Sequence, residues 1–285
     1  MKDNRIRAHE NEIGILSLLH RYGHVRQADI ARAIWPTSSR GSAVNSASRT
    51  LGRLLRAKQI YRRMNTLGGF SYMLAGPGAN RIGTVLGEDA RSGRGLTSVD
   101  GSQFLHRTLE SRYLIEKEIE GFTGYGEYAI YRGVGGFSRD LFAKKFKKIP
   151  DGLILVKGAT RGYDQEITLV DWLEVEGHYK PPQEREKILD VATKSGTWLD
   201  MKRKVMLHRV VFVYLAVNGH QRSLREGIDN FIRAHDIKDP FFFDSIVLAE
   251  CDVLPPFSWR GYTEKTWLDV LKSRGLDEAG KPISE

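Results

Sequence analysis

The chain has 285 residues, of which 41% are hydrophobic and 28% are charged. This composition supplies enough apolar material for packed cores and excludes bulk disorder, and the length exceeds one typical domain, so we expect two folded modules. The longest apolar runs, such as residues 209–217, are far shorter than the roughly 20 residues of a membrane helix, and the polar start indicates no signal peptide, which excludes membrane and secretory classes. Cys251 is the only cysteine, so an internal disulfide framework and a multi-thiolate zinc site are excluded, and we expect a reducing, cytoplasmic location.

Positive charge is concentrated in the first third of the chain. Residues 1–95 carry 16 Lys and Arg against 6 Asp and Glu, a net charge of +10, whereas residues 96–285 carry 28 against 29, a net charge of −1. A basic module joined to a nearly neutral one is expected when one part holds a polyanion. The charge distribution therefore favours nucleic-acid binding by the first module.

Three amphipathic helices are predicted in this basic module. Apolar residues at helical spacing predict helices over 12–22, 26–35 and about 43–58, the second of them ended by Pro36. The inward side chains expected on the third helix are Val44, Leu51, Leu54 and Leu55. Its outward face is rich in Arg, Asn and Ser without an acid, which suits a helix that reads DNA bases and holds phosphates.

A β-hairpin is predicted next. Residues 60–66 and 70–75 read as two strands, and the glycines of Leu67-Gly-Gly69 allow the turn. Three helices followed by a hairpin predict a winged helix-turn-helix. The side chains expected to contact DNA are Arg40, Asn45, Ser46, Arg49, Arg53, Arg56, Lys58, Arg62 and Arg63. The same elements also fit a protein-docking module, an alternative that the unopposed arginines make less favourable than DNA.

A segment rich in Gly and charge predicts the module boundary. Residues 86–95 lack apolar periodicity. We therefore expect a winged-helix domain over 1–86, a linker over 87–101, a nuclease-like domain over 102–255 and a C-terminal extension over 256–285. Duplex binding by the first 95 residues is expected to fall steeply with salt and to survive deletion of residues 96–285.

The second module alternates helices and strands. The pattern predicts a helix over 103–120, then strands over 127–132, 150–156 and 166–176, a helix over 183–204, a strand over 209–217, a helix over 224–234 and a strand over 243–254. Helix, three strands, helix, strand is the order of a restriction-endonuclease-like core. The predicted fold class is thus α+β, an N-terminal winged helix-turn-helix joined to a restriction-endonuclease-like α/β core with a mixed sheet.

Three carboxylates occupy predicted strand ends in that core. Asp151 follows Pro150 at the start of one strand, and Glu174 and Glu176 lie near the end of the next, two residues apart and so on one face. With the Val175 carbonyl they would form an all-oxygen site suited to Mg²⁺ or Mn²⁺, which can activate water and stabilise the charge of a cleaved phosphodiester. Acids at strand ends are also often only solvated.

The chain resembles the replication-relaxation family over roughly residues 10–250. The resemblance is carried by Tyr72-Met-Leu-Ala-Gly-Pro-Gly-Ala-Asn-Arg81, a helix opened by His106, Pro150-Asp-Gly-Leu-Ile-Leu155 and Trp172-Leu-Glu-Val-Glu176. The family includes MobC-type plasmid relaxases, which combine a winged helix with a PD-(D/E)xK nuclease-like domain. The resemblance implies that Asp151 and Glu174 bind the metal and places Glu176 where nuclease relatives have lysine.

The acid at position 176 leaves the catalytic cation unassigned. Lys180 beyond the strand and Lys187 or Lys194 on the following helix are the candidates, and solvent-facing helix lysines are the ordinary alternative. Glu110 or Glu116 is a candidate further acid, with an exposed i,i+4 pair as the simpler interpretation. Five tyrosines are candidate nucleophiles for a covalent DNA intermediate, although tyrosines in strands usually pack: Tyr125, Tyr128, Tyr131, Tyr163 and Tyr179.

These features predict a DNA-binding, metal-dependent nicking or processing protein of a plasmid or other mobile element. Asp151, Glu174, Glu176, Lys180 and Lys187 are the expected catalytic residues, and double-stranded DNA is the expected partner. Other mobilisation or replication proteins and a homodimer stay open, and no membrane is expected. The alternative is a non-catalytic DNA-binding regulator or accessory factor with a degenerate nuclease-like domain; a restriction or transposon-end endonuclease is a third interpretation.

Overall fold

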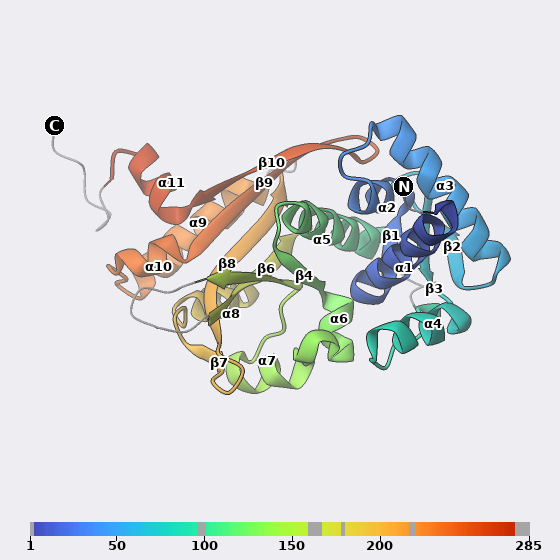
Figure 1. Cartoon of the computed structure of the whole chain (residues 1–285). Coiled ribbons are helices and arrows are strands. Elements are labelled where there is room, and N and C mark those ends of the chain that lie inside the picture. Colours follow the sequence, from blue (N-terminus) through green and yellow to red (C-terminus); the bar gives the residue numbers. More distant parts are fainter. Residues whose placement is uncertain (1–2, 96–100, 159–166, 178–179, 217–219, 277–285) are drawn as a thin grey trace. The chain divides into compact units, whose positions relative to one another are not determined.

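The computed structural model describes residues 3–95, 101–158, 167–177, 180–216 and 220–276 (Figure 1). They form two compact units that divide between Arg139 and Asp140. The class is α+β with a mixed sheet, as the sequence predicts. Of the expected linker at 87–101, residues 87–95 and 101 lie inside the first unit, and residues 96–100 are outside the described ranges.

Three helices open the first unit: α1 (Asn4–Tyr22), α2 (Gln27–Ile34) and α3 (Arg40–Arg56). All three predicted helices are present, and α1 begins earlier than expected because the Asp3 side chain caps it by accepting from the Arg5 amide. The buried face of α3 consists of Ala43, Ala47, Thr50, Leu51 and Leu54, whereas Val44 and Leu55, predicted to face inward, are only half-buried. Helix α3 packs against α2.

The predicted hairpin is confirmed. Strands β2 (Ile60–Met64) and β3 (Phe70–Leu74) pair antiparallel, and β1 (His24–Arg26) pairs with the other edge of β3 to give the order β1-β3-β2. Gly68 and Gly69 adopt positive φ in the turn, as expected. The segment that follows the hairpin forms a helix, α4 (Gly76–Leu86), with a proline in its first turn.

The rest of the first unit contains α5 (Gly101–Ile119), β4 (Thr123–Gly126), α6 (Glu127–Arg132) and a short 3₁₀ turn, Val134–Gly136. The strand predicted over 127–132 is wrong: this segment is helical. Tyr and Ile favour strands. However, Glu127 in the first turn favours a helix, and Gly133, in the left-handed conformation after the last turn, ends it. Helix α5 packs against α2 and β1 (Figure 1).

The second unit contains a mixed sheet in the order β10-β9-β8-β6-β5. Its strands are β5 (Gly152–Gly158), β6 (Ile167–Glu176), β8 (Val205–Leu215), β9 (Ile246–Leu254) and β10 (Ser258–Thr266), and β7 (Trp198–Asp200) pairs with β8. The central strands β6, β8 and β9 run parallel, whereas β5 and β10 are antiparallel to their neighbours. Strands β8 and β9 are nearly continuous apolar runs, as expected for strands covered on both faces, whereas β6 also carries Asp171, Glu174 and Glu176.

Helices of this unit are α7 (Arg139–Phe146), whose first residue belongs to the first unit, α8 (Pro182–Ala192), α9 (His220–Ala234), α10 (Pro240–Asp244) and α11 (Trp267–Ser273). The helix predicted over 183–204 is wrong beyond residue 192, because Gly196 turns the chain at positive φ into β7. The strand predicted over 243–254 begins later, at Ile246, because residues 240–244 form α10, which Asp239 caps with its side chain. The predicted C-terminal extension supplies β10 and α11.

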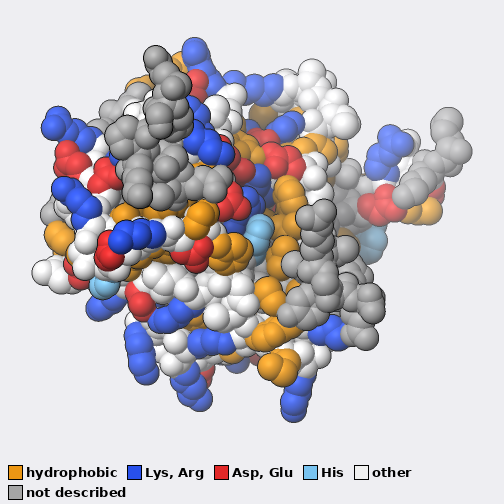
Figure 2. All heavy atoms as spheres, turned by 90° about the vertical axis from the view of Figure 1, so that its left-hand side faces the viewer, with side chains coloured by type: hydrophobic (Ala, Val, Ile, Leu, Met, Phe, Trp, Pro, Cys, Tyr) orange, Lys and Arg blue, Asp and Glu red, His pale blue; other side chains and the backbone are white. Residues whose placement is uncertain are grey.

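Charge divides between the two units as it does along the sequence. Residues 1–139 carry 21 Lys and Arg against 12 Asp and Glu, a net charge of +9, and residues 140–285 carry 23 of each. Figure 2 looks onto the side on which α9, α10 and α11 lie in Figure 1, and there basic and acidic side chains are interspersed. Among the described residues, no helix is long and apolar enough to cross a membrane.

Candidate functional site

Asp151 lies where β5 begins and is fixed to the neighbouring strand β6. Its amide donates to the Leu173 carbonyl at 3.0 Å, and its Oδ2 accepts from the Val175 amide at 2.8 Å. Pairing of β5 with β6 stops at Gly152, opposite Leu173, so the Asp151 carboxylate satisfies an amide of β6 that the β5 backbone no longer reaches. The carboxylate is therefore held at the end of β6.

Glu174 and Glu176 share the face of β6 that also carries Trp172. Both glutamates have no solvent exposure. Glu174 Oε1 accepts from Trp172 Nε1 at 2.8 Å, and Trp172 is packed edge-on against Phe142 and Phe146 of α7. The indole thus fixes the orientation of the Glu174 carboxylate against the apolar core.

Lys180 brings the three carboxylates together. Its Nζ lies 2.9 Å from Glu174 Oε2, 3.5 Å from Glu176 Oε1 and 3.6 Å from Asp151 Oδ2. Burial alone would lower the pKa of Lys180, but the charges of the three carboxylates raise it well above its ordinary value, so the side chain is an ammonium ion. We call Asp151, Glu174, Glu176 and Lys180 the acid–lysine cluster.

Two further cations border the acid–lysine cluster. Lys148 Nζ lies 3.6 Å from Glu174 Oε2, and Arg185 of α8 lies 3.3 Å from Glu176 Oε2. Arg185 also donates to the Ser223 carbonyl at 3.0 Å. Three cations therefore balance three carboxylates, although burial still leaves the pKa of Glu174 above its ordinary value, with Lys180 opposing that rise.

The cluster has the donor chemistry of a site for Mg²⁺ or Mn²⁺. Its ligating atoms are carboxylate oxygens, and within the described residues Glu176 Oε1 is buried without a hydrogen bond. However, no group of three His, Cys, Asp or Glu side chains in the described parts of the chain is close enough together to hold a metal ion. The cluster therefore has the type of ligand atom that a divalent cation prefers. The distances between these oxygens match the Lys180 ammonium, which lies among them.

The other candidates lie elsewhere. Lys187 is exposed on α8, and Lys194 forms an exposed pair with Asp190 at 2.6 Å. Glu116 is buried in the first unit and pairs with Arg32 at 2.9 Å, and Glu110 accepts from the Glu127 amide at 2.8 Å. Three of the candidate tyrosines belong to the first unit, Tyr125, Tyr128 and Tyr131, and two lie outside the described residues, Tyr163 and Tyr179.

Sequence reasoning missed Lys148 and Arg185. A signal for Arg185 was present: on α8 it shares a face with Ile188 and Leu189, three and four residues on, so a charged side chain falls on an apolar helix face. A charged side chain is buried on such a face when it has a buried partner of opposite charge, and the partner of Arg185 is Glu176. Lys148 lay unassigned in the basic stretch that precedes Pro150.

The predicted DNA-contacting residues fall into two groups. Arg40, Asn45, Arg49, Arg56, Lys58 and Arg62 are exposed and Ser46 is half-buried on the same helix. Arg53 is held by Glu12 of α1 at 3.0 Å, and Arg63 lies over the Phe104 ring. Arg53 and Arg63 therefore make contacts within the first unit, and the residues of the first group are available to a partner.

A hollow of about 580 Å³ lies beside the start of α3. Arg26 and Gln27 line it from the start of α2, Arg40 and Asn45 from α3, and Gly69 from the hairpin turn. An adjoining hollow of about 470 Å³ is lined by Ser42, Asn45, Ser46, Ser48 and Arg49. Donor-rich side chains thus surround a concave surface between α3 and the hairpin, a suitable setting for a polyanion.

Comparisons with known proteins give no match: no family model matches the chain, and no curated protein or solved structure is significantly similar to it.

Proposed function

We propose that the protein binds double-stranded DNA and nicks or processes it with a divalent metal ion, as a protein of a plasmid or other mobile element. The single observation that carries the proposal is the position of Lys180, whose ammonium is held by Asp151, Glu174 and Glu176 at the ends of adjacent strands. A nuclease of the PD-(D/E)xK type needs two acids and a cation at such an edge, and Lys180 supplies the cation that position 176 lacks.

Asp151 and Glu174 would hold Mg²⁺ or Mn²⁺, which when bound supplies a nucleophilic water and charge stabilisation at the phosphate. Lys180 would then be free of Asp151 and available to the developing negative charge, and Arg185 would keep Glu176 in place. Trp172 fixes Glu174 through its indole N–H. With these roles the second unit would be restriction-endonuclease-like, as the resemblance to the replication-relaxation family implies.

The first unit would be a winged helix that holds the duplex. Three helices, the β2–β3 hairpin and a net charge of +9 support this part of the proposal. Arg40, Asn45 and Arg49 would face the DNA from α3.

A second candidate is a non-catalytic DNA-binding regulator or accessory factor. The observation that favours it is the charge balance of the cluster, in which Lys180, Lys148 and Arg185 already neutralise the carboxylates. In that case the second unit would serve as a platform for a partner.

A cleavage assay distinguishes these two candidate functions. Its substrate is a supercoiled plasmid that carries the DNA neighbouring this gene, and it contains Mg²⁺ or Mn²⁺. Wild type should produce open circles, Asp151→Asn and Lys180→Met should not, and Asp190→Asn on the exposed side of α8 should cleave like wild type. Band shifts without cleavage by any of them would favour the regulator, and linear product would indicate a double-strand endonuclease.

A further inference from the structure

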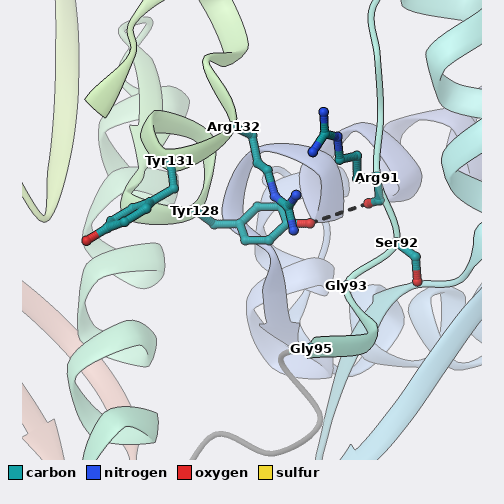
Figure 3. A pocket seen from close by; sticks show the side chains of 7 residues that line it. All are labelled: Arg91, Ser92, Gly93, Gly95, Tyr128, Tyr131 and Arg132. Atoms are coloured by element: carbon teal, nitrogen blue, oxygen red, sulfur yellow. Dashed lines mark hydrogen bonds between the residues drawn. The ribbon is translucent and has the colours of Figure 1, made fainter. Parts of the chain in front are cut away.

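A second concave site lies in the first unit and is lined by none of the residues assigned to the duplex. It is a pocket of about 440 Å³, within the range of roughly 300–1,000 Å³ typical of small-ligand sites. Two segments form it: residues 91–95, which follow α4, and helix α6 (Figure 3). Its lining consists of Arg91, Ser92, Gly93, Gly95, Tyr128, Tyr131 and Arg132.

The wall formed by residues 91–95 is held in place. The Gly93 amide donates to the Leu74 carbonyl at 2.9 Å, and the Ser92 hydroxyl donates to the same carbonyl at 3.2 Å. A Cβ at position 93 would lie only 3.1 Å from Met73 Cβ, so glycine allows the segment to lie against β3. Tyr128 joins the two walls, because its hydroxyl donates to the Arg91 carbonyl at 3.4 Å (Figure 3).

The pocket combines cations with aromatic rings. The guanidinium of Arg132 lies 5.3 Å from the centre of the Tyr128 ring, and Figure 3 shows Arg91 reaching toward Arg132 from the opposite segment. Among the described residues no carboxylate forms an ion pair with Arg132, and Arg91 pairs only with the exposed Asp89. Both guanidiniums are therefore available to an anion at little cost.

One ring at the pocket is open to solvent. Tyr131 is 49% exposed, and in Figure 3 its ring points away from Arg91 and Arg132. Arg139 lies 5.3 Å from the centre of this ring. An exposed tyrosine beside arginines is the combination on which unpaired nucleic-acid bases stack while their phosphates are bound.

We infer that this pocket binds a nucleotide of single-stranded DNA, with a phosphate between Arg91 and Arg132 and an unpaired base against Tyr131. A duplex offers phosphates but keeps its bases stacked, so it lacks the group that the exposed ring fits. The site goes beyond the proposed function, since it needs neither the acid–lysine cluster nor the outward face of α3. It would hold one strand once the duplex has opened.

The test is fluorescence anisotropy of the full-length protein with a labelled short oligothymidylate, in the presence of a chelator so that cleavage does not contribute. Arg132→Gln should weaken binding and lower the slope of log K against log salt by about 0.7, the value for one phosphate of a single strand. Tyr131→Ala should weaken it by about fivefold or more, the lower limit for loss of one stacked base. Arg222→Gln, an exposed arginine of α9, is the matched control and should bind like wild type.

A labelled duplex separates this site from the proposed duplex interface. Arg132→Gln should leave duplex affinity unchanged, and Arg49→Gln should lower duplex affinity while leaving oligothymidylate binding within about twofold of wild type. Equal oligothymidylate affinity in wild type, Arg132→Gln and Tyr131→Ala would overturn the inference. Competition by thymidine monophosphate at the same nucleotide concentration would also overturn it, because the ligand would then be a free nucleotide rather than a strand. Loss of plasmid nicking in Asp151→Asn bears on the other proposal alone.

Discussion

The Nζ atom of Lys180 lies 2.9 Å from Glu174 Oε2, and both side chains are almost entirely withdrawn from water. Taking either charge out of water alone is costly, so each compensates the desolvation of the other. The pair is therefore a structural requirement of the second unit whether or not the protein is an enzyme, and variants must be judged by stability as well as by activity.

Replacing Lys180 by Met, which is similar in length but uncharged, should destabilise the protein by about 3–5 kcal/mol because Glu174 and Glu176 lose a buried counterion. Urea unfolding would measure the change. Lys194→Met removes a lysine from an exposed pair and should change the free energy of unfolding by no more than about 0.5 kcal/mol. The double variant Lys180→Met with Glu174→Gln should recover part of the loss; equal stability of the single and double variants would contradict the pairing.

Glu110 should make stability fall as pH rises. Burial, reinforced by the charge of Glu127, raises its pKa to about 8 from the ordinary value of 4.5. The folded state then holds a proton that the unfolded state releases, so the stability present below pH 4.5 is lost as pH rises through about 8. Glu110→Gln keeps an acceptor for the Glu127 amide without the charge.

Glu110→Gln should have the same free energy of unfolding as wild type near pH 4.5 and a larger one near pH 8. Unfolding in urea at several pH values would measure the difference. Glu226→Gln, on an exposed part of α9, should follow the wild-type pH dependence. Parallel curves for wild type and Glu110→Gln would show that Glu110 does not titrate in this range.

Gly227 of α9 leaves room for Arg185. A Cβ at this position would lie 2.8 Å from Arg185 Cδ, so Gly227→Ala should displace the guanidinium from Glu176 and destabilise the protein by about 1–3 kcal/mol. Gly52 lies within α3 with no atom closer than 3.9 Å to such a Cβ, so Gly52→Ala should instead stabilise the protein by about 0.5–1 kcal/mol. Thermal unfolding compares the two, and a stabilising Gly227→Ala would contradict the close approach.

Arg49 and Arg53 lie on the same helix but should behave differently. Arg49 is exposed, whereas Arg53 is paired with Glu12. If α3 faces duplex DNA, Arg49→Gln should reduce the salt dependence of duplex binding by about 0.9 in the log–log slope, the value for one phosphate. Compared with Arg49→Gln, Arg53→Gln should change that slope less and should lower the thermal unfolding temperature more. A salt titration of duplex binding and a melting curve would check the two expectations.

Much of the fold was predictable because apolar spacing is a strong signal in long elements. The three N-terminal helices, the hairpin and strands β5, β6, β8 and β9 all follow from that spacing. The errors lie in short segments, such as 127–132 and 192–204, where residue preferences for strand or helix were overridden by caps and by a glycine at positive φ. Local composition does not report these backbone conformations.

The candidate site was predictable in its acids and less so in its cations. Strand-end spacing was enough to single out Asp151, Glu174 and Glu176, whereas the choice between Lys180, Lys187 and Lys194 depends on tertiary structure. Lys180 lies against the acids, and the other two lysines lie on exposed surfaces. Long-range placement of this kind comes from packing, which one sequence does not reveal.

Asp29 of α2 accepts from Arg112 of α5 at 3.0 Å, and the His24 ring lies 5.4 Å from that of Phe104. Both partners come after residue 95, the last residue of the segment predicted to bind the duplex on its own. A shortened protein that stops at residue 95 would expose the buried Asp29 and the aromatic surface of β1 to water, and it should aggregate or be degraded. The smallest piece worth expressing for binding work is therefore residues 1–139.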